Sequence, residues 1–119
     1  MKTQDCIFCK IIAKQAPADI IMETDTLIVI KDLNPVAAIH YLIIPKEHIV
    51  DITSMTDQQT QIGADIFACA NVLANREKIM NSFKLAINNG YDAGQRVFHL
   101  HAHFIAGFGE TVLNKTYGI

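Results

Sequence analysis

Three of the chain's five histidines, His99, His101 and His103, alternate with apolar residues in the stretch FHLHAH. On a β-strand alternate side chains face the same way, so this spacing predicts three imidazoles on one face of a strand, in a cleft or at the surface. A single histidine is more often a structural or solvated residue than a functional one. Three adjacent imidazoles disfavour one another's protonation, however, which indicates that the cluster has a chemical use.

Two uses compete for these histidines. Neutral imidazoles bind zinc and similar ions, but no Asp or Glu, the usual additional ligand of a hydrolytic metal site, lies between Gln95 and Gly109. Alternatively, an imidazole with a pKa of about 6.5 is largely neutral near pH 7 and can attack phosphorus without a separate base. The preceding loop, NNGYDAGQ, favours the second use, because Gly90 and Gly94 allow backbone N–H groups to curl around a phosphate; an ordinary turn fits this loop equally well.

The cysteines pose a separate question. The chain has 3 cysteines, of which Cys6 and Cys9 form a Cys-x-x-Cys pair in CIFC. An odd number of cysteines does not resemble a secreted disulfide framework, so we expect a reducing, cytoplasmic setting. In that setting the pair would be two free thiols, a redox couple or half of a metal site, and on its own it is a weak zinc signal.

Length and composition limit the class of protein. The 119 residues suit one domain, 1–119, and 50% hydrophobic with 18% charged residues is typical of a globular chain with a packed core. A net charge of -2 without a basic run argues against binding to nucleic acid. The apolar runs are too short to span a membrane, and the polar start MKTQD does not open a signal peptide.

The elements that must position the histidines follow from periodicity. Helical spacing of apolar residues predicts a short helix over 5–14 with Asp5 as its cap. A capping-box pattern from Thr56 to Gln59 predicts the start of a long helix that fades near Met80. The apolar positions that follow this start at helical spacing are Ile62, Ile66, Phe67, Ala70 and Leu73.

β-Branched and alternating runs predict the strands. Residues 19–23 and 26–32 form a hairpin, residues 39–45 form a central strand ended by Pro45, and the last two strands cover 82–88 and 96–106. The expected fold class is therefore α+β: an antiparallel sheet of about five strands with one long helix and a short amino-terminal helix.

The motif FHLHAHF resembles the signature of the histidine triad (HIT) nucleotide-binding family, in which histidines alternate with apolar residues. The resemblance extends to the amino-terminal segment CIFCKIIAKQAPADIIMETD, to VIKDLNPVAAIHYLIIPKEHI and to INNGYDAGQRVFHLHAH. Within the family the pattern is most similar to the Hint branch of nucleoside phosphoramidases.

The resemblance implies roles for four histidines. His101 would attack the α-phosphorus of a nucleoside 5′-phosphoramidate and form a covalent nucleotidyl-histidine, which water then cleaves. His103 would touch the phosphate and help protonate the departing amine, His99 would help to position the others, and His40 matches a further active-site histidine. No cofactor would be required for catalysis.

The resemblance also implies a nucleotide-binding site. Asn88 and the backbone around Gly94 and Gln95 would hold the phosphate, and Asp32 would accept hydrogen bonds from the ribose. The apolar wall around the base would comprise Ile7, Phe8, Ile11, Ile30 and Leu33. Composition alone favours plainer roles for these residues: Asp32 as a turn cap, Asn88 as a strand-end cap and the apolar residues as core.

Some bacterial HIT proteins complete a zinc site of the Cys-x-x-Cys kind with two histidines, which match His48 and His99 here. The resemblance therefore implies a structural zinc site formed by Cys6, Cys9, His48 and His99. The chain departs from the Hint pattern at Arg96, where many members have a small or polar residue, which leaves its leaving-group preference open. The tail, 107–119, gives no guidance about the substrate.

The resulting hypothesis is a homodimeric phosphoramidase acting on purine nucleotides of the AMP or GMP type. Two alternatives stay open: hydrolysis of dinucleoside polyphosphates, and a non-catalytic module that binds a nucleotide or zinc.

Overall fold

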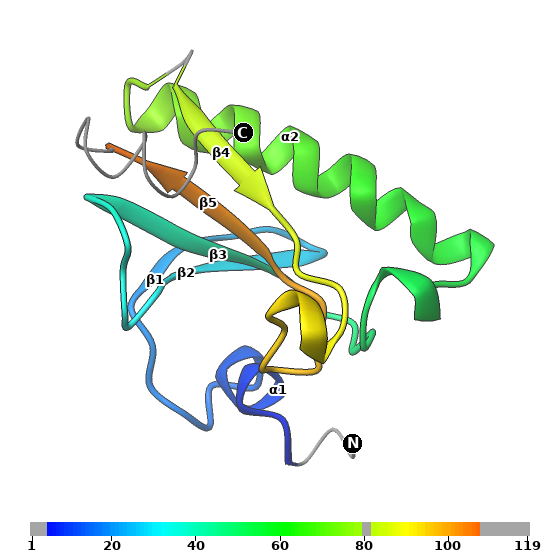
Figure 1. Ribbon diagram of the computed structural model, residues 1–119. Helices are drawn as coiled ribbons and strands as arrows, with labels where there is room; N and C mark the ends of the chain where they lie inside the picture. Colours follow the sequence, from blue (N-terminus) through cyan, green and yellow to red (C-terminus); the bar gives the residue numbers. More distant parts are fainter. Residues whose placement is uncertain (1–4, 80–81, 108–119) are drawn as a thin grey trace.

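The computed structural model describes residues 5–79 and 82–107. It contains a five-stranded antiparallel sheet in the order β1-β2-β3-β5-β4 (Figure 1). The strands are β1 (Ile20–Glu23), β2 (Leu27–Lys31), β3 (Ile39–Pro45), β4 (Phe83–Ala86) and β5 (Ala102–Ala106). Together with two α-helices, α1 (Ile7–Ile12) and α2 (Gln61–Arg76), this arrangement confirms the predicted α+β class and the central place of β3.

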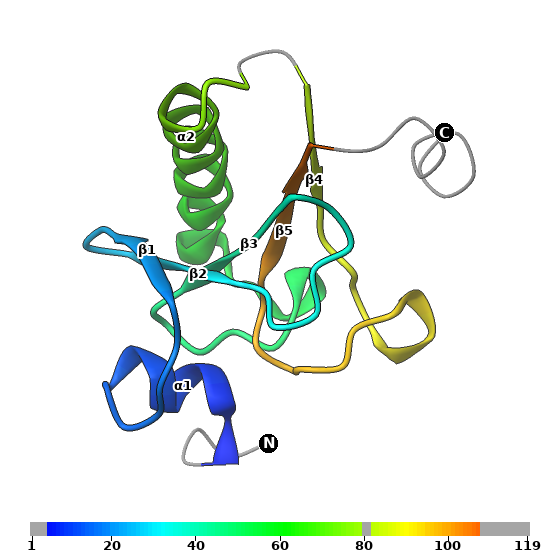
Figure 2. The same cartoon turned by 90° about the vertical axis from the view of Figure 1, so that its left-hand side faces the viewer.

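The two helices bury opposite faces of the sheet. In Figure 2, α2 runs along one side of the sheet and α1 lies on another. Along β2, Leu27 and Val29 pack in the cluster under α2, whereas Ile28 and Ile30 pack in the cluster under α1. Because both faces are covered, the strand is apolar at four successive positions, Leu27 to Ile30, as expected for a strand buried on both sides.

The predicted capping box is present at the start of the long helical region. The Thr56 N–H donates to the Gln59 side-chain oxygen at 2.8 Å. The box opens a short 3₁₀-helix, η3 (Asp57–Thr60), which leads into α2. At the other end the helix stops at Arg76 rather than near Met80, because Lys78 adopts a positive φ of 61° that turns the chain away from the helix axis. Met80 itself lies outside the described residues.

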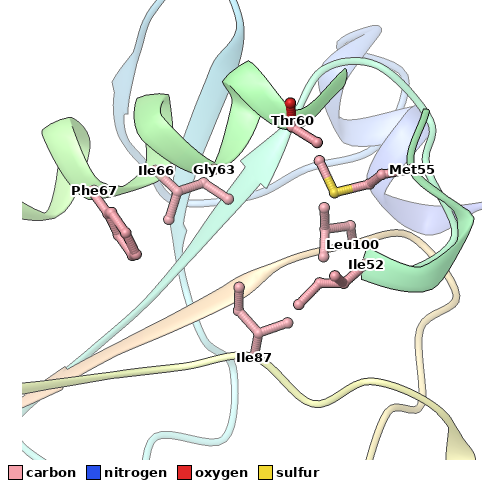
Figure 3. A pocket seen from close by; sticks show the side chains of 8 residues that line it. All are labelled: Ile52, Met55, Thr60, Gly63, Ile66, Phe67, Ile87 and Leu100. Carbon is pink, nitrogen blue, oxygen red and sulfur yellow. The ribbon is translucent and has the colours of Figure 1, made fainter. Parts of the chain in front are cut away.

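One residue of the predicted helical stripe is on the wrong side. Ile62, Ile66, Ala70 and Leu73 are buried against the sheet, but Phe67 is 70% exposed. It follows Ile66 by one residue, about 100° around the helix, and so leaves the packed face. It lies instead in an apolar hollow shown in Figure 3.

The amino-terminal helix is shorter than predicted and has a different cap. It covers Ile7–Ile12 instead of 5–14, and its N-cap is Cys6, whose sulfur accepts a hydrogen bond from the Cys9 N–H. The predicted cap, Asp5, is exposed. A six-residue helix is too short to be stable alone, so its place depends on the burial of Phe8 and Ile11 beneath the sheet.

The last strand also differs from the prediction. It begins at Ala102 and not at residue 96, so His99 and His101 lie in the connection before it and only His103 is on the strand. The backbone in this connection bonds elsewhere: the Leu100 N–H donates to the Ile49 carbonyl at 2.6 Å. The expected row of three imidazoles on one strand face is therefore wrong, and His99 is fully buried.

The remaining differences are small. The predicted strand over 82–88 covers Phe83–Ala86, and the loop after it contains a 3₁₀ turn, η4 (Tyr91–Ala93). Among the described residues, no helix has the length and apolar character needed to cross a bilayer.

Candidate active site and metal centre

Most of the predicted site residues line one pocket of about 420 Å³. The members of the predicted set found there are Ile7, Phe8, Ile30, Asp32, Leu33, Asn88, Gly94, His101 and His103. Four of the predicted catalytic and nucleotide-binding residues, Ile11, His40, Gln95 and His99, do not line it. Ile11 is buried in the core beneath α1. His40 contacts the lining residue His103 at 2.9 Å, and the Gln95 side chain donates to the carbonyl of the lining residue Val97 at 3.1 Å.

The tautomer of His101 is fixed by the backbone. Its Nδ1 lies 2.8 Å from the carbonyl oxygen of His99. A carbonyl can only accept, so Nδ1 carries the proton and Nε2 keeps a free lone pair. Burial lowers the pKa of His101 below its ordinary value, while the bond to the carbonyl and the negative charge of Asp32 oppose this shift. The neutral ring, with an unprotonated Nε2, is thereby favoured.

A second chain of hydrogen bonds orients His103. The Val36 N–H donates to His40 Nδ1 at 3.2 Å, so His40 carries its proton on Nε2. That Nε2 lies 2.9 Å from Nδ1 of His103 and 3.3 Å from Oδ2 of Asp32. In the neutral pair His40 therefore donates to His103, whose own proton is on Nε2.

Both histidines of this pair are held in the neutral form. Burial lowers the pKa of His40, and the charge of Asp32 partly opposes it. Burial, with smaller contributions from His101 and His40, lowers the pKa of His103 to about 4. An added anion in the pocket would act in the opposite direction.

Asp32 serves the turn and the pocket at once. Its Oδ1 accepts a hydrogen bond from the Asn34 N–H at 2.8 Å, which is the turn-capping role that composition alone favours. Its Oδ2 lies on the side of His40. The two roles are compatible because each uses a different carboxylate oxygen.

The loop before β5 is braced from within. Gly94 has a left-handed φ of +103°, and a Cβ there would lie 3.3 Å from the Asn88 side-chain nitrogen. The Gly94 N–H donates to the Tyr91 carbonyl and the Gln95 N–H to the Gly90 carbonyl, each at 3.0 Å. These two amides, expected to surround a phosphate, are engaged inside the loop.

The Gln95 side chain is buried and bonds in three directions. Its oxygen accepts from the Gly90 N–H at 2.8 Å, and its nitrogen donates to the carbonyls of Val50 and Val97 at 2.8 and 3.1 Å. Gln95 therefore supports the shape of the loop rather than contacting the pocket.

The four candidate metal ligands converge beside this pocket. The ligand atoms of Cys6, Cys9, His48 and His99 all lie within 4.8 Å of one another. The Cys9 sulfur is 3.2 Å from His48 Nδ1 and 3.5 Å from His99 Nδ1, and the two Nδ1 atoms are 3.1 Å apart. With Zn–S bonds of about 2.3 Å and Zn–N bonds of about 2.0 Å, a zinc tetrahedron has edges of about 3.3–3.8 Å, so these separations fit.

The donor chemistry of His99 fits a metal as well. Its Nε2 lies 2.7 Å from the Pro45 carbonyl, so the proton is on Nε2 and the Nδ1 lone pair faces the cysteines. In the absence of a cation, burial raises the pKa of the Cys9 thiol to about 11. A metal ion would favour the thiolate.

Phe8 connects the two sites. Its ring meets the His99 ring edge-on at a centroid distance of 5.8 Å and the His101 ring at 5.0 Å. The helix that carries Phe8 starts at Cys6, one of the candidate ligands. The His99 side chain thus belongs to the metal cluster, while its carbonyl belongs to the active site.

The pocket also contains residues that sequence reasoning missed. Leu42 and Val97 add apolar residues to its lining, and Lys31 and Asn34 add polar ones. Leu42 could have been found, because it follows His40 by two residues on the same strand and so faces the same side. Val97 had no comparable signal.

By its fold and site, the chain is an antiparallel α+β protein with a cluster of histidines at a pocket. Sequence comparison gives the family: the profile described as "Scavenger mRNA decapping enzyme C-term binding" matches residues 5–117. An uncharacterized HIT-like protein of Synechocystis sp. is 38% identical over 104 residues, covering 87% of this chain and 91% of the relative. The protein HitA of Neisseria gonorrhoeae is 36% identical over 101 residues, covering 85% and 94%.

Solved structures agree with this assignment. A HIT family hydrolase from Clostridium thermocellum has a TM-score of 0.85 at 42% identity, covering 90% of this chain and 94% of that one. A histidine triad nucleotide-binding protein from Candida albicans has a TM-score of 0.80 at 33% identity, covering 89% and 77%. This chain belongs to the histidine triad family, and these relatives support a hydrolase activity in general.

Proposed function

We propose that this protein is a phosphoramidase of the Hint branch, which hydrolyses the P–N bond of purine nucleoside 5′-phosphoramidates through a nucleotidyl-histidine. One observation carries the proposal: the His99 carbonyl holds the proton of His101 on Nδ1 at 2.8 Å, which leaves Nε2 as a nucleophile. The same pocket contains Asp32 and Asn88, which suit a ribose and a phosphate.

In the first step, Nε2 of His101 attacks the α-phosphorus and the bond from phosphorus to the leaving nitrogen breaks. The departing amine takes a proton from Nε2 of His103, which must be in its charged form for this transfer. The bound phosphate and the nearby Asp32 carboxylate both favour that form.

In the second step, water attacks the phosphorus of the nucleotidyl-histidine. The bond to Nε2 of His101 breaks, and the proton of the water passes to His103, which restores its charged form. The product is the nucleoside monophosphate. Catalysis then depends on positioning and on the stabilisation of charge, so no cofactor takes part in the chemistry.

The apolar wall suits a flat purine base. Phe8 and Ile30 are buried and therefore preformed, whereas Leu33 is 91% exposed and free to cover a base that enters. Asp32 keeps acceptor capacity for ribose hydroxyls, because a carboxylate can accept more than one hydrogen bond per oxygen.

We also propose that Cys6, Cys9, His48 and His99 hold a structural zinc ion. When bound, zinc supplies a closed cross-link between the start of α1, the connection that follows β3 and the connection that precedes β5. The cysteines Cys6, Cys9 and Cys69 are free thiols in the described part of the chain, which suits a cytoplasmic location.

A homodimer is the third part of the proposal, and an apolar hollow supports it. This hollow of about 230 Å³ is lined by Ile52, Met55, Thr60, Gly63, Ile66, Phe67, Ile87 and Leu100 (Figure 3). It adjoins β4, the last strand in the order of the described sheet. A second copy that packed on this hollow would cover Phe67.

Sedimentation of two variants tests the dimer. Phe67→Glu should shift the protein to monomer, whereas Val72→Glu, an exposed apolar residue of the same helix outside the hollow, should not. Unchanged sedimentation of Phe67→Glu would contradict the proposed interface.

The activity is tested with adenosine 5′-phosphoramidate. We expect the wild-type protein to release AMP, His101→Ala to be inactive, and the exhaustively chelated protein to stay active while its circular dichroism shows a retained fold. Mass spectrometry at neutral pH should detect the nucleotide on His101 during turnover. Full activity of His101→Ala would exclude this nucleophile, and loss of activity on chelation without unfolding would indicate a catalytic metal.

A further inference from the structure

We propose that Arg96 makes this site selective for substrates whose leaving group carries a carboxylate or phosphate anion. The inference rests on the proposed function, since it names the substrate class of the same site. It is carried by the position of the guanidinium, by its hydrogen bonds and by the charges around it.

The guanidinium of Arg96 is held by hydrogen bonds of Nη1 alone. Its Nη1 donates to the carbonyls of Tyr91 and Gln95 at 2.7 and 3.1 Å. The guanidinium carbon lies 3.9 Å from the centroid of the Tyr91 ring. Guanidinium has five N–H donors, and these two bonds leave the donors on Nε and Nη2 for a ligand. Because the group is already ordered, binding an anion costs little additional side-chain entropy.

Arg96 also lacks an acidic partner within residues 5–79 and 82–107, where no carboxylate forms an ion pair with it. The other cation that lines the pocket, Lys31, lies 3.5 Å from Asp19. The positive charge of Arg96 is therefore the one available to a bound anion, and a planar fork of donors matches two oxygens of a carboxylate or phosphate.

The pocket has two chemically different sides. α1 and β2 contribute the apolar wall, with Asp32 just after β2, whereas the loop between β4 and β5 contributes Asn88, Gly94 and Arg96. In Figure 2, α1 and this loop, drawn in yellow, lie on either side of the chain that leads into β5. The Asp32 carboxylate repels an anion, so an anionic leaving group is favoured on the loop side.

The loop offers few other groups for an anion. The N–H groups of Gly94 and Gln95 donate to carbonyls inside the loop. Arg96 supplies the donors that these two amides do not. It takes no part in proton transfer, so the bonds that break and form are those of the proposed reaction.

Three adenosine substrates test the inference. The first is the phosphoramidate of glycine, with a free carboxylate; the second is that of glycine methyl ester, which is uncharged; the third is diadenosine triphosphate, whose leaving group is a nucleoside diphosphate. The variants are Arg96→Gln, which removes the charge, and Arg76→Gln as the matched control at an exposed arginine on α2.

We expect Arg96→Gln to lower kcat/KM about 10- to 100-fold for an anionic leaving group, as for the loss of a charge-assisted hydrogen bond, and less than about 3-fold for the methyl ester. Arg76→Gln should change none of them. Loss confined to the glycine substrate identifies a carboxylate as the ligand, and loss confined to diadenosine triphosphate identifies a phosphate.

Equal effects of Arg96→Gln on the charged and uncharged substrates would overturn the inference. If the wild-type protein cleaves none of the three, the proposed hydrolase function fails, and calorimetric binding of the same compounds then decides about Arg96. Equal affinity of wild type and Arg96→Gln for the anionic compounds would overturn it in that case too.

Discussion

His99 and His101 are joined by a hydrogen bond of 2.8 Å in which the backbone carbonyl of the first fixes the tautomer of the second. The side chain of His99 points the other way, into the cluster with Cys6 and Cys9. A substitution of the His99 side chain leaves the carbonyl in the chain, so the two contributions of this residue can be separated by experiment.

The first prediction concerns zinc. Cys9→Ser should reduce bound zinc from about one ion per chain to nearly none and lower the midpoint of urea unfolding, because the ligand set is then incomplete. Cys69→Ala is the matched control: this thiol is buried in the other core cluster, where burial raises its pKa to about 11. Elemental analysis and urea titration measure both effects, and unchanged zinc content in Cys9→Ser would refute the site.

The second prediction concerns His40, which orients His103 through the 2.9 Å bond. Removing that bond in His40→Ala should lower kcat for the phosphoramidate roughly tenfold, the value of about one hydrogen bond, with little change in KM. A p-nitrophenyl ester of AMP, whose leaving group needs no proton, provides the control. If both substrates lost the same activity, His40 would have a structural role and not one in protonation.

The third prediction concerns Gly94. Gly94→Ala should destabilise the protein by about 1–3 kcal/mol, because alanine is strained at a φ of +103° and its Cβ would press on the Asn88 side chain. Gly63→Ala, in α2 with no atom within 4 Å of the added Cβ, should instead stabilise it by about 0.5–1 kcal/mol. Urea unfolding of both variants checks the contrast; equal stability of the two would show that the loop relaxes.

The fourth prediction concerns pH. The folded pKa of His103 is lowered to about 4, so between its ordinary value of 6.5 and about 4 the unfolded chain binds more protons than the folded one. The stability of the fold with a neutral, buried His103 ring is therefore fully present above pH 6.5, and part of it is lost as the pH falls towards 4. His103→Gln should therefore lose stability less steeply over that range than wild type in urea titrations. A slope identical to that of wild type would mean that His103 is not buried as a neutral ring.

The same direction of shift applies to activity. Because the pKa of His101 lies below its ordinary value, its Nε2 stays unprotonated to lower pH than a solvated histidine would allow. On the acid side, kcat/KM should fall through protonation of this group only below about pH 6.5. A pH profile from 4.5 to 8 measures it, and a fall that begins near pH 7.5 would contradict the assignment.

Local patterns predicted the parts of the fold that local forces determine. The strand ended by Pro45 and the capping box at Thr56 and Gln59 were both correct, because each depends on residues next to it in the chain. The length of β5 was not, since the N–H of Leu100 bonds to Ile49 from a distant segment. Phe67 was misplaced because its apolar character reflects a surface hollow and not the core.

In the candidate site, too, the sequence predicts residues by their own chemistry but not contacts with distant segments. The histidines, Asp32 and the cysteines could be selected because their chemistry and their resemblance to a family pattern are visible in the sequence. The bracing role of Gln95 could not, because its partner at Val50 is 45 positions away. Likewise, the direction of the Arg96 guanidinium depends on the carbonyl and the ring of Tyr91, which no spacing rule places.

The six-residue helix α1 begins at a metal-ligand candidate and presents Phe8 to the ring of His101. A ligand that binds at one end of α1 orders the helix. A second ligand that binds at the other end then costs less conformational entropy. Thermodynamic reciprocity then requires that a cation at the cysteines strengthens nucleotide binding by the same factor by which the nucleotide strengthens retention of the cation. Exchange of the ion should accordingly be slower in protein saturated with AMP.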